Sequence, residues 1–262
     1  MPVTRTQIKT LKTLRTGKGR REQGQFLAEG IRLLEEALRH DYRPAAVYYC
    51  NPQLTERGRR LLARFRDRAV DTREMSATQL QAVTTVKAPQ AMVGVFDIPA
   101  SRSAELFGPK IRSVVVCESV SDPGNLGTLI RSAVAFRFHL MLLLGMSADP
   151  YSPKVVRSTA GAIFGLTILK STVTELLRLL DMRGFKLIAT HRRGVTDMRR
   201  LKAAAKASRI MIGVGSESKG LSASMLDRSD LQWRIEHAPA VESLNAAVAG
   251  SIIMKQVYDL RR

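Results

Sequence analysis

Residues 114–136 read VVVCESVSDPGNLGTLIRSAVAF: a short apolar run, a loop with Pro123 and Gly124, and then a long helical pattern. The run from Val114 to Cys117 is short and β-branched, which is typical of a strand buried on both faces. Proline and glycine directly before a helical pattern form a tight turn. The stretch therefore predicts a strand, a turn and a helix, the repeating unit of a parallel α/β sheet.

The same alternation continues to the end of the chain. Short apolar strands between helices predict a mainly parallel sheet that is covered on both faces. The apolar runs predict strands over 139–144, 162–169, 185–190 and 209–214, and the helical patterns predict helices starting at 153, over 173–182 and over 243–260.

The residues upstream predict a smaller α/β unit. Leu27, Ile31, Leu34 and Leu38 lie at helical spacing and predict a helix over 26–39. We further expect strands over 45–50 and 91–96 and helices over 55–67 and 78–83. Two prolines and a glycine within 98–110 indicate a linker. We therefore predict two domains, residues 1–104 and 105–262.

The charge of the chain indicates a polyanionic partner. The net charge is +19, and both halves of the chain are basic. No basic amphipathic helix with an aromatic face is evident, so nucleic acid is favoured over a membrane surface. Aromatic residues make up 5% of the chain, which favours backbone and shape contacts over base stacking. No apolar run approaches the roughly 18 residues of a membrane span.

Cysteine and histidine usage predicts a cytoplasmic protein without a metal. Two cysteines are too few for a disulfide framework or a closed zinc site, and the four histidines show no ligand spacing. The N-terminus has no apolar signal region.

Residues 1–24 carry seven basic side chains against one acidic residue, Glu22. Two interpretations stay open: a solvated arm, or a segment that contacts RNA directly. The candidate RNA-binding residues are Arg15, Lys18, Arg20 and Arg21.

Three loops could form a ligand site beyond the carboxyl ends of the strands. In the first, Asn125 and Arg131 do not share a helix face, so we expect Asn125 in the turn and Arg131 nearly two turns into the helix. As an alternative, Asn125 merely caps the helix and Arg131 is an ordinary surface residue.

The second loop, GVGSESKGLS (213–222), does not fit two common nucleotide motifs. Its third glycine comes one residue late for a dinucleotide fingerprint, and Leu221 stands where a phosphate-binding P-loop has lysine. The third loop, VESLNAAVAGS (241–251), opens the last helix, where Ser243 is the expected N-cap and the small residues favour close packing.

In this order, DPGNLGTLIRSAVAF, GVGSESKGLS and VESLNAAVAGSI resemble the three motifs of the SpoU/TrmH family of RNA ribose 2′-O-methyltransferases. The segment YSPKVVRSTAGAIFGL (151–166) is similar to the family's middle segment. GQFLAEGIRLLEEAL and PQAMVGVF resemble its accessory RNA-binding domain, which has an α/β fold.

The resemblance implies an α/β knot, in which the chain threads a deep trefoil knot near the C-terminus, and a homodimer with the final helix at its interface. It implies that S-adenosylmethionine is held near Gly215, Ile235, His237 and Leu244. It also implies a catalytic site of Asn125, Arg131, Glu217, Ser243 and Asn245. The substrate would be ribosomal RNA first and transfer RNA second.

The residue types suit this chemistry. A ribose hydroxyl must lose its proton as it attacks a methyl carbon, and the family proposal gives Arg131 the role of base or of positioning group. The pKa of free arginine is above about 12, so the side chain stays protonated at neutral pH. Stabilisation of a developing alkoxide is therefore physically easier than base catalysis. No metal is needed, because the sulfonium is already an activated leaving group.

The chain departs from the family pattern before the third motif. Glu236 and His237 replace a proline and a methionine, and Pro239-Ala240 replaces a flexible turn. These changes affect the expected adenine loop rather than the catalytic residues. The alternative function is a catalytically weak or inactive RNA-binding or ribosome-assembly factor on the same fold.

Overall fold

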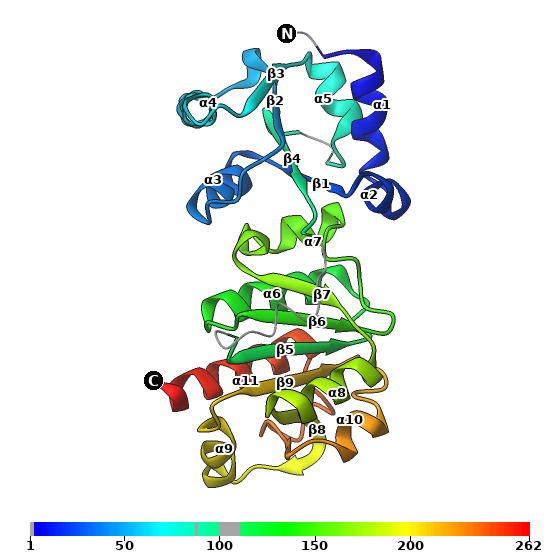
Figure 1. Ribbon diagram of the computed structural model, residues 1–262, viewed down its shortest axis with the longest axis vertical. Coiled ribbons are helices and arrows are strands. Elements are labelled where there is room, and N and C mark those ends of the chain that lie inside the picture. The colour runs from blue at the N-terminus through cyan, green and yellow to red at the C-terminus, as the bar shows by residue number, and fades with distance from the viewer. Residues whose placement is uncertain (1–2, 87–88, 100–110) are drawn as a thin grey trace. The chain divides into compact units, whose positions relative to one another are not determined.

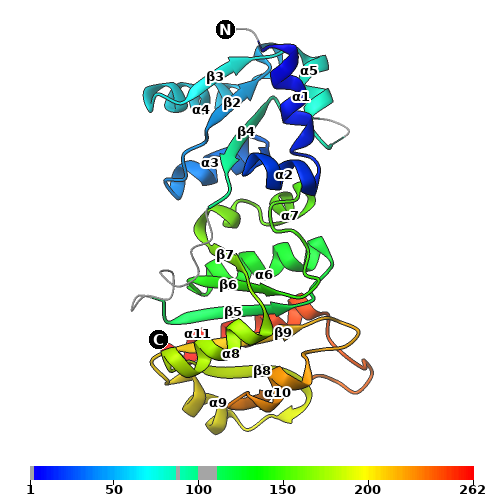
Figure 2. The same cartoon turned by 45° about the vertical axis from the view of Figure 1, so that its right-hand side comes forward.

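The computed structural model describes residues 3–86, 89–99 and 111–262, which form two compact units (Figures 1 and 2). The first unit contains the described residues up to Pro99 together with Asp149–Gly165. The second contains the described residues from Ile111 to Ala148 and from Leu166 to Arg262. The boundary predicted between residues 104 and 105 lies outside the described residues, as does most of the linker predicted over 98–110.

The first unit is built on a mixed four-stranded sheet in the order β1-β4-β2-β3. Strand β4 pairs antiparallel with β1 and β2, and β2 pairs parallel with β3. The elements are α1 (Arg5–Thr13), α2 (Gly17–Gln23), β1 (Gln25–Glu29), α3 (Ile31–Arg39), β2 (Ala46–Tyr49), η1 (Asn51–Gln53), α4 (Glu56–Asp67), β3 (Asp71–Glu74), α5 (Ala77–Val83), β4 (Met92–Asp97), α7 (Pro153–Ser158) and η3 (Ala162–Gly165).

One helix predicted for this unit is wrong, and helices α1 and α2 and strand β3 were not predicted. The helix predicted over 26–39 is strand β1 followed by α3, because Gly30 between them adopts φ 108°, a conformation that a helix cannot continue through. Strand β3 was not predicted, because its sequence Asp71–Glu74 is polar and has no apolar alternation.

The second unit is built on a six-stranded, wholly parallel sheet in the order β10-β8-β9-β5-β6-β7. The prediction of a mainly parallel sheet is confirmed, whereas the strand order was not predicted. The elements are β5 (Ser113–Glu118), α6 (Pro123–Ala135), β6 (Leu140–Leu144), β7 (Thr167–Lys170), α8 (Val173–Arg183), β8 (Lys186–Val195), α9 (Met198–Ala205), β9 (Ile210–Gly215), α10 (Ala223–Asp227), β10 (Leu231–Trp233) and α11 (Ala246–Arg261). The predicted strand over 162–169 divides into η3 and β7, and α9, α10 and β10 were not predicted.

Helices cover both faces of this sheet. Leu176 of α8 and Met225 of α10 pack in one buried cluster with Val114, Val116 and Met211 of the central strands. Helices α6 and α11 pack against each other, and α11 also packs against β9 (Figure 1). Because β5 and β9 are buried along almost their whole length, the sheet fixes the loops that follow them.

Candidate active site

The loops after β5 and β9 emerge at the same edge of the sheet. The two strands are parallel neighbours, and their last paired residues are Glu118 and Gly215. The Glu118 carboxylate accepts a hydrogen bond from the main-chain nitrogen of Ser222 at 2.8 Å, which links the two loops. This carboxyl edge is where open α/β sheets bind ligands.

Asn125 joins three segments that are distant in the sequence. Its amide nitrogen donates to the Glu217 carboxylate, and its amide oxygen accepts a hydrogen bond of 3.0 Å from Asn245. Asn125 is the third residue of α6, and the cap of that helix is Asp122, whose carboxylate accepts from the Asn125 main chain at 2.9 Å. The expectation that Asn125 lies in the turn and the alternative that it caps the helix are therefore both wrong. Its side chain is free to contact the other loops.

Asn245, rather than Ser243, is the N-cap of α11. Its side-chain oxygen accepts hydrogen bonds from the main-chain nitrogens of Ala247 (2.9 Å) and Val248 (3.2 Å). One amide thus caps the helix with its oxygen and binds Asn125 with its nitrogen. Ser243 lies exposed two residues before the cap, because the chain enters the helix later than the sequence pattern indicates.

Arg131 does not touch this polar cluster. It lies six residues beyond Asn125 on α6, which corresponds to about 9 Å along the helix axis. Its side chain is exposed and has no hydrogen bond or ion pair with any described residue. The next residue, Ser132, exchanges a hydrogen bond of 2.7 Å with Ser251 of α11, which fixes the helix pair at this level. Arg131 is thus an unpaired cation on a rigid support.

Gly215 ends the buried part of β9 at a point where only glycine fits. A Cβ atom there would lie 2.1 Å from the main-chain carbon of Gly220, because the loop from Ser216 turns back on itself. A side chain would therefore displace the backbone of the loop that carries Glu217.

The segment between β10 and α11 offers main-chain groups to a ligand. Among the described residues, the segment from Ile235 to Leu244 makes one hydrogen bond between main-chain groups, from the Val241 nitrogen to the Ala238 oxygen. The side chains of Ile235 and Leu244 are half-buried. Free peptide groups beside apolar side chains suit a purine base, which needs both stacking and hydrogen bonds. Here the residues fit an adenine-bearing cofactor.

His237 and its neighbour Glu236 are both exposed in this segment. The His237 ring contacts the adjacent Ala238 oxygen at 3.2 Å and no other described residue. Because water solvates both side chains, neither places a buried charge in the loop. The departure from the family pattern therefore leaves the main-chain groups accessible.

Two further polar groups at this edge were missed in the sequence. The Nδ1 atom of His191 and the hydroxyl of Ser222 are buried without a hydrogen-bond partner among the described residues. His191 follows Thr190, whose hydroxyl donates to the Gly213 oxygen at 2.9 Å, so it lies level with the end of β9. Its signal was a polar residue at the end of a predicted strand, a place that favours ligand contact.

The basic residues of α2 and of the turn between α1 and α2 differ in exposure. Arg15, Lys18 and Arg21 are exposed. Arg20 is only 4% exposed: its guanidinium binds the Asp149 carboxylate at 2.5 Å and the Leu14 oxygen at 2.9 Å. We therefore correct its placement, because a guanidinium that is buried and paired with Asp149 is not presented to RNA at the surface.

Other kinds of chemistry find little support. No group of three potential metal ligands occurs among residues 3–86, 89–99 and 111–262. Burial raises the pKa of the Cys117 thiol to about 12, so this cysteine stays protonated and is no nucleophile. Within the same residues, no helix has the length and apolar character to cross a membrane.

Two family models match the chain. The model of the SpoU rRNA Methylase family matches residues 112–255, and that of the MRM3-like substrate binding domain matches residues 5–94. The chain belongs to the SpoU rRNA methylase family. The first match covers the whole parallel sheet, α6 and the first part of α11, and the second covers most of the mixed sheet.

Relatives and solved structures of this SpoU methylase extend over almost its full length. A tRNA/rRNA methyltransferase of Synechocystis, slr1673, is 34% identical over 99% of this chain and 93% of its own. The 23S rRNA (guanosine(2553)-2′-O)-methyltransferase RlmP of Bacillus subtilis is 29% identical over 97% and 96%. The crystal structure of AviRb from Streptomyces viridochromogenes in complex with AdoMet is 26% identical, with a TM-score of 0.83 over 98% of both chains.

Proposed function

We propose that this SpoU methylase transfers a methyl group from S-adenosylmethionine to a ribose 2′-hydroxyl of structured RNA, with ribosomal RNA as the first candidate and transfer RNA as the second. The observation that carries the proposal is the Asn125–Glu217–Asn245 cluster, since it joins all three sequence motifs at one sheet edge. Relatives with the names of RNA 2′-O-methyltransferases support it.

The cofactor would bind between the loop after β9 and the segment 235–244. Gly215 lets the loop backbone approach closely, Ile235 and Leu244 provide apolar contacts, and His237 borders the site. When bound, S-adenosylmethionine supplies an electrophilic methyl group on a positively charged sulfur. Two neighbours of similar fold were solved with AdoMet bound, AviRb and an rRNA methyltransferase from Sinorhizobium meliloti.

Arg131 is the group that we assign to the reacting 2′-oxygen. Its guanidinium carries a permanent charge and has no described partner to neutralise it. As the hydroxyl loses its proton to solvent or to a nearby RNA phosphate, a fixed cation lowers the energy of the developing alkoxide. Arg131 acts here as an electrostatic group and not as the base.

The polar cluster positions the loops. Glu217 and Asn245 hold the Asn125 amide from both ends, so all three motifs keep one relative geometry. Because the contacts are partly exposed, they can exchange with a ribose or phosphate. Ser243, exposed beside the cluster, adds a hydroxyl that can bind the same substrate groups.

The finer features of the fold belong to the same proposal. We expect a trefoil knot because the chain leaves the edge strand β10 and returns through 234–245, so that α11 packs on β9 and α6 near the sheet centre. We expect a homodimer through α11, whose Val248 is 46% exposed beside small residues. An apolar side chain at the surface of a small-residue helix favours a subunit contact.

Residues 1–104 would recognise the RNA and residues 105–262 would carry out the transfer, in the cytoplasm and without a metal. Exposed Lys18 and Arg21 supply positive charge on α2, and exposed Arg15 supplies it in the turn before that helix. The match of residues 5–94 to a substrate binding domain supports this division.

Methyl transfer with radiolabelled S-adenosylmethionine tests the proposal. Purified protein is incubated with unmodified ribosomal RNA and, separately, transfer RNA. Label in an alkali-resistant, 2′-O-methylated dinucleotide is the expected result. RNA binding without transfer to either RNA, together with undetectable cofactor binding by calorimetry, would favour the alternative of a non-catalytic RNA-binding factor.

A further inference from the structure

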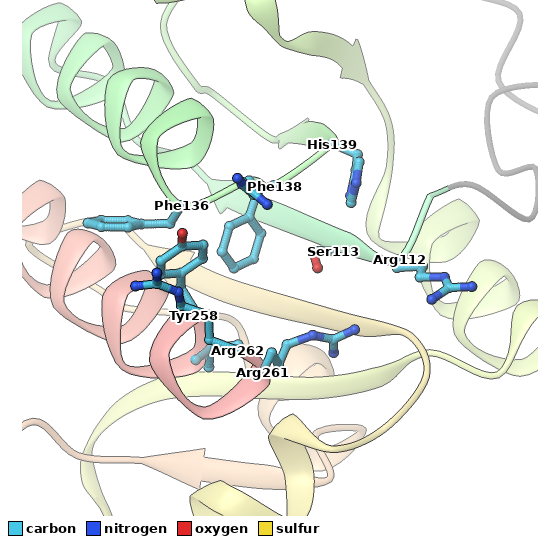
Figure 3. A pocket seen from close by; sticks show the side chains of 10 residues that line it. Arg112, Ser113, Phe136, Phe138, His139, Tyr258, Arg261 and Arg262 are labelled. Atoms are coloured by element: carbon cyan, nitrogen blue, oxygen red, sulfur yellow. The ribbon is translucent and has the colours of Figure 1, made fainter.

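A cavity of about 570 Å³ lies at the amino edge of the parallel sheet, opposite the candidate active site (Figure 3). Its walls come from the residues before β5, the turn between α6 and β6, and the last turns of α11. Half of the lining residues are arginines or a histidine, namely Arg112, Arg137, His139, Arg261 and Arg262. None of the described lining residues has an acidic side chain.

Main-chain oxygens, and no acidic side chain of the described residues, bind the guanidinium of Arg261. The Arg261 guanidinium donates to the main-chain oxygens of Ala205, Ala207 and Ser208, at 3.1, 2.9 and 3.4 Å, which carry no formal charge. Burial lowers the pKa of Arg261, and the nearby charge of Arg112 lowers it further. An anion bound between these two guanidinium groups would reduce their mutual repulsion.

Aromatic rings form the apolar wall of the same cavity. Phe136 at the end of α6 and Tyr258 of α11 have ring centroids 6.0 Å apart. Figure 3 shows both rings near Phe138, with Arg261 and Arg262 on the same helix as Tyr258. Arginine beside aromatic rings suits a nucleotide, because the cations bind phosphate and the rings contact the base or ribose.

We propose that this cavity binds a phosphate group of the RNA backbone and forms a second RNA contact, remote from the reaction site. The six residues of β5 separate the two edges by about 20 Å, so one structured RNA can reach both. The net charge of +19 favours a polyanion over a small free anion. The inference rests on the proposed function only in taking RNA as the substrate.

Replacing Arg137 removes one positive charge without lowering the stability of the fold. Arg137 adopts φ 59°, a left-handed conformation that glycine takes without strain. Arg137→Gly is therefore expected to keep or raise the melting temperature, and any loss of RNA binding cannot come from unfolding. Arg178→Ala is the matched control, since it removes one exposed arginine from α8 in the same unit.

The test measures the affinity for unmodified ribosomal RNA by fluorescence anisotropy across a salt series. We expect Arg137→Gly to weaken binding about threefold to tenfold and to reduce the salt slope by about one, with a larger effect for Arg112→Ala/Arg137→Gly. Arg178→Ala should change neither quantity. Affinity for S-adenosylmethionine, measured by calorimetry, should be the same in all four proteins.

A double variant that binds RNA like the Arg178→Ala control would overturn the proposal. Inorganic phosphate is titrated in a second arm: phosphate binding that is lost in the double variant while RNA affinity stays unchanged would assign the cavity to free phosphate. The salt slope needs no methyl transfer, so a wild-type protein that binds RNA without methylating it would contradict the proposed function alone.

Discussion

Helices α2 and α6 both carry arginines. The fold places these arginines in different environments. On α2, Arg20 is buried, and its guanidinium forms an ion pair with Asp149 and a hydrogen bond with a main-chain oxygen. On α6, Arg131 is exposed and has no described partner. Charge that folding has neutralised serves stability, whereas charge left unpaired on a rigid helix is available for substrate.

Replacing Arg131 tests the chemical side of this comparison and should have the largest effect. We expect Arg131→Ala to lower the rate of methyl transfer about 10²- to 10³-fold, since loss of one preorganised group opposite a developing oxyanion costs this much in other enzymes. The melting temperature should hardly change, because the side chain is exposed and has no hydrogen bond or ion pair with a described residue. Single-turnover transfer and thermal unfolding measure the two quantities. A rate within twofold of wild type would remove Arg131 from the reaction.

Replacing Arg20 tests the structural side. We expect Arg20→Ala to lower the free energy of unfolding by about 3 kcal/mol, because it leaves a carboxylate and a main-chain oxygen without their partner in a largely buried place. Urea unfolding measures the loss, and Arg21→Ala on the same helix is the control. If the two variants unfolded at the same urea concentration, the Arg20–Asp149 pair would not stabilise the fold.

Asn245 combines both uses in one side chain, and two substitutions separate them. Asn245→Ala removes the cap of α11 and should cost about 1 kcal/mol of stability. Asn245→Asp keeps a good capping oxygen but loses the donor to Asn125 and adds a second carboxylate near Glu217. We expect nearly wild-type stability for Asn245→Asp and at least tenfold slower transfer for both variants. Wild-type transfer by Asn245→Asp would show that the asparagine acts only as a cap.

The same comparison explains what the sequence could and could not predict. The parallel sheet followed from apolar runs between helices, and the meeting of the first two loops followed from their place after predicted strands. The third loop follows β10, which was not predicted, so only the family resemblance brought it to the same site. The pairing of Asn125 with Asn245 spans 120 residues, and that of Arg20 with Asp149 spans 129, so local patterns contain no trace of either. Strand β1 was taken for helix because Leu27 fits both periods, and the decisive φ of Gly30 is invisible in the sequence.

The exposed neighbours of Arg20 should give the smallest effect, and they complete the comparison. Arg21 has no described hydrogen bond or ion pair, and Lys18 makes only a solvent-exposed contact of 3.8 Å with Glu22. If these helices contact RNA, each exposed cation adds one weak phosphate contact. We expect Arg21→Ala to weaken RNA binding about twofold to threefold and to lower the salt slope by about one. Anisotropy across a salt series measures both, with Arg199→Ala of α9 as an exposed control. An unchanged slope would leave the first two helices as a solvated surface, because phosphate contacts cannot form without releasing counterions.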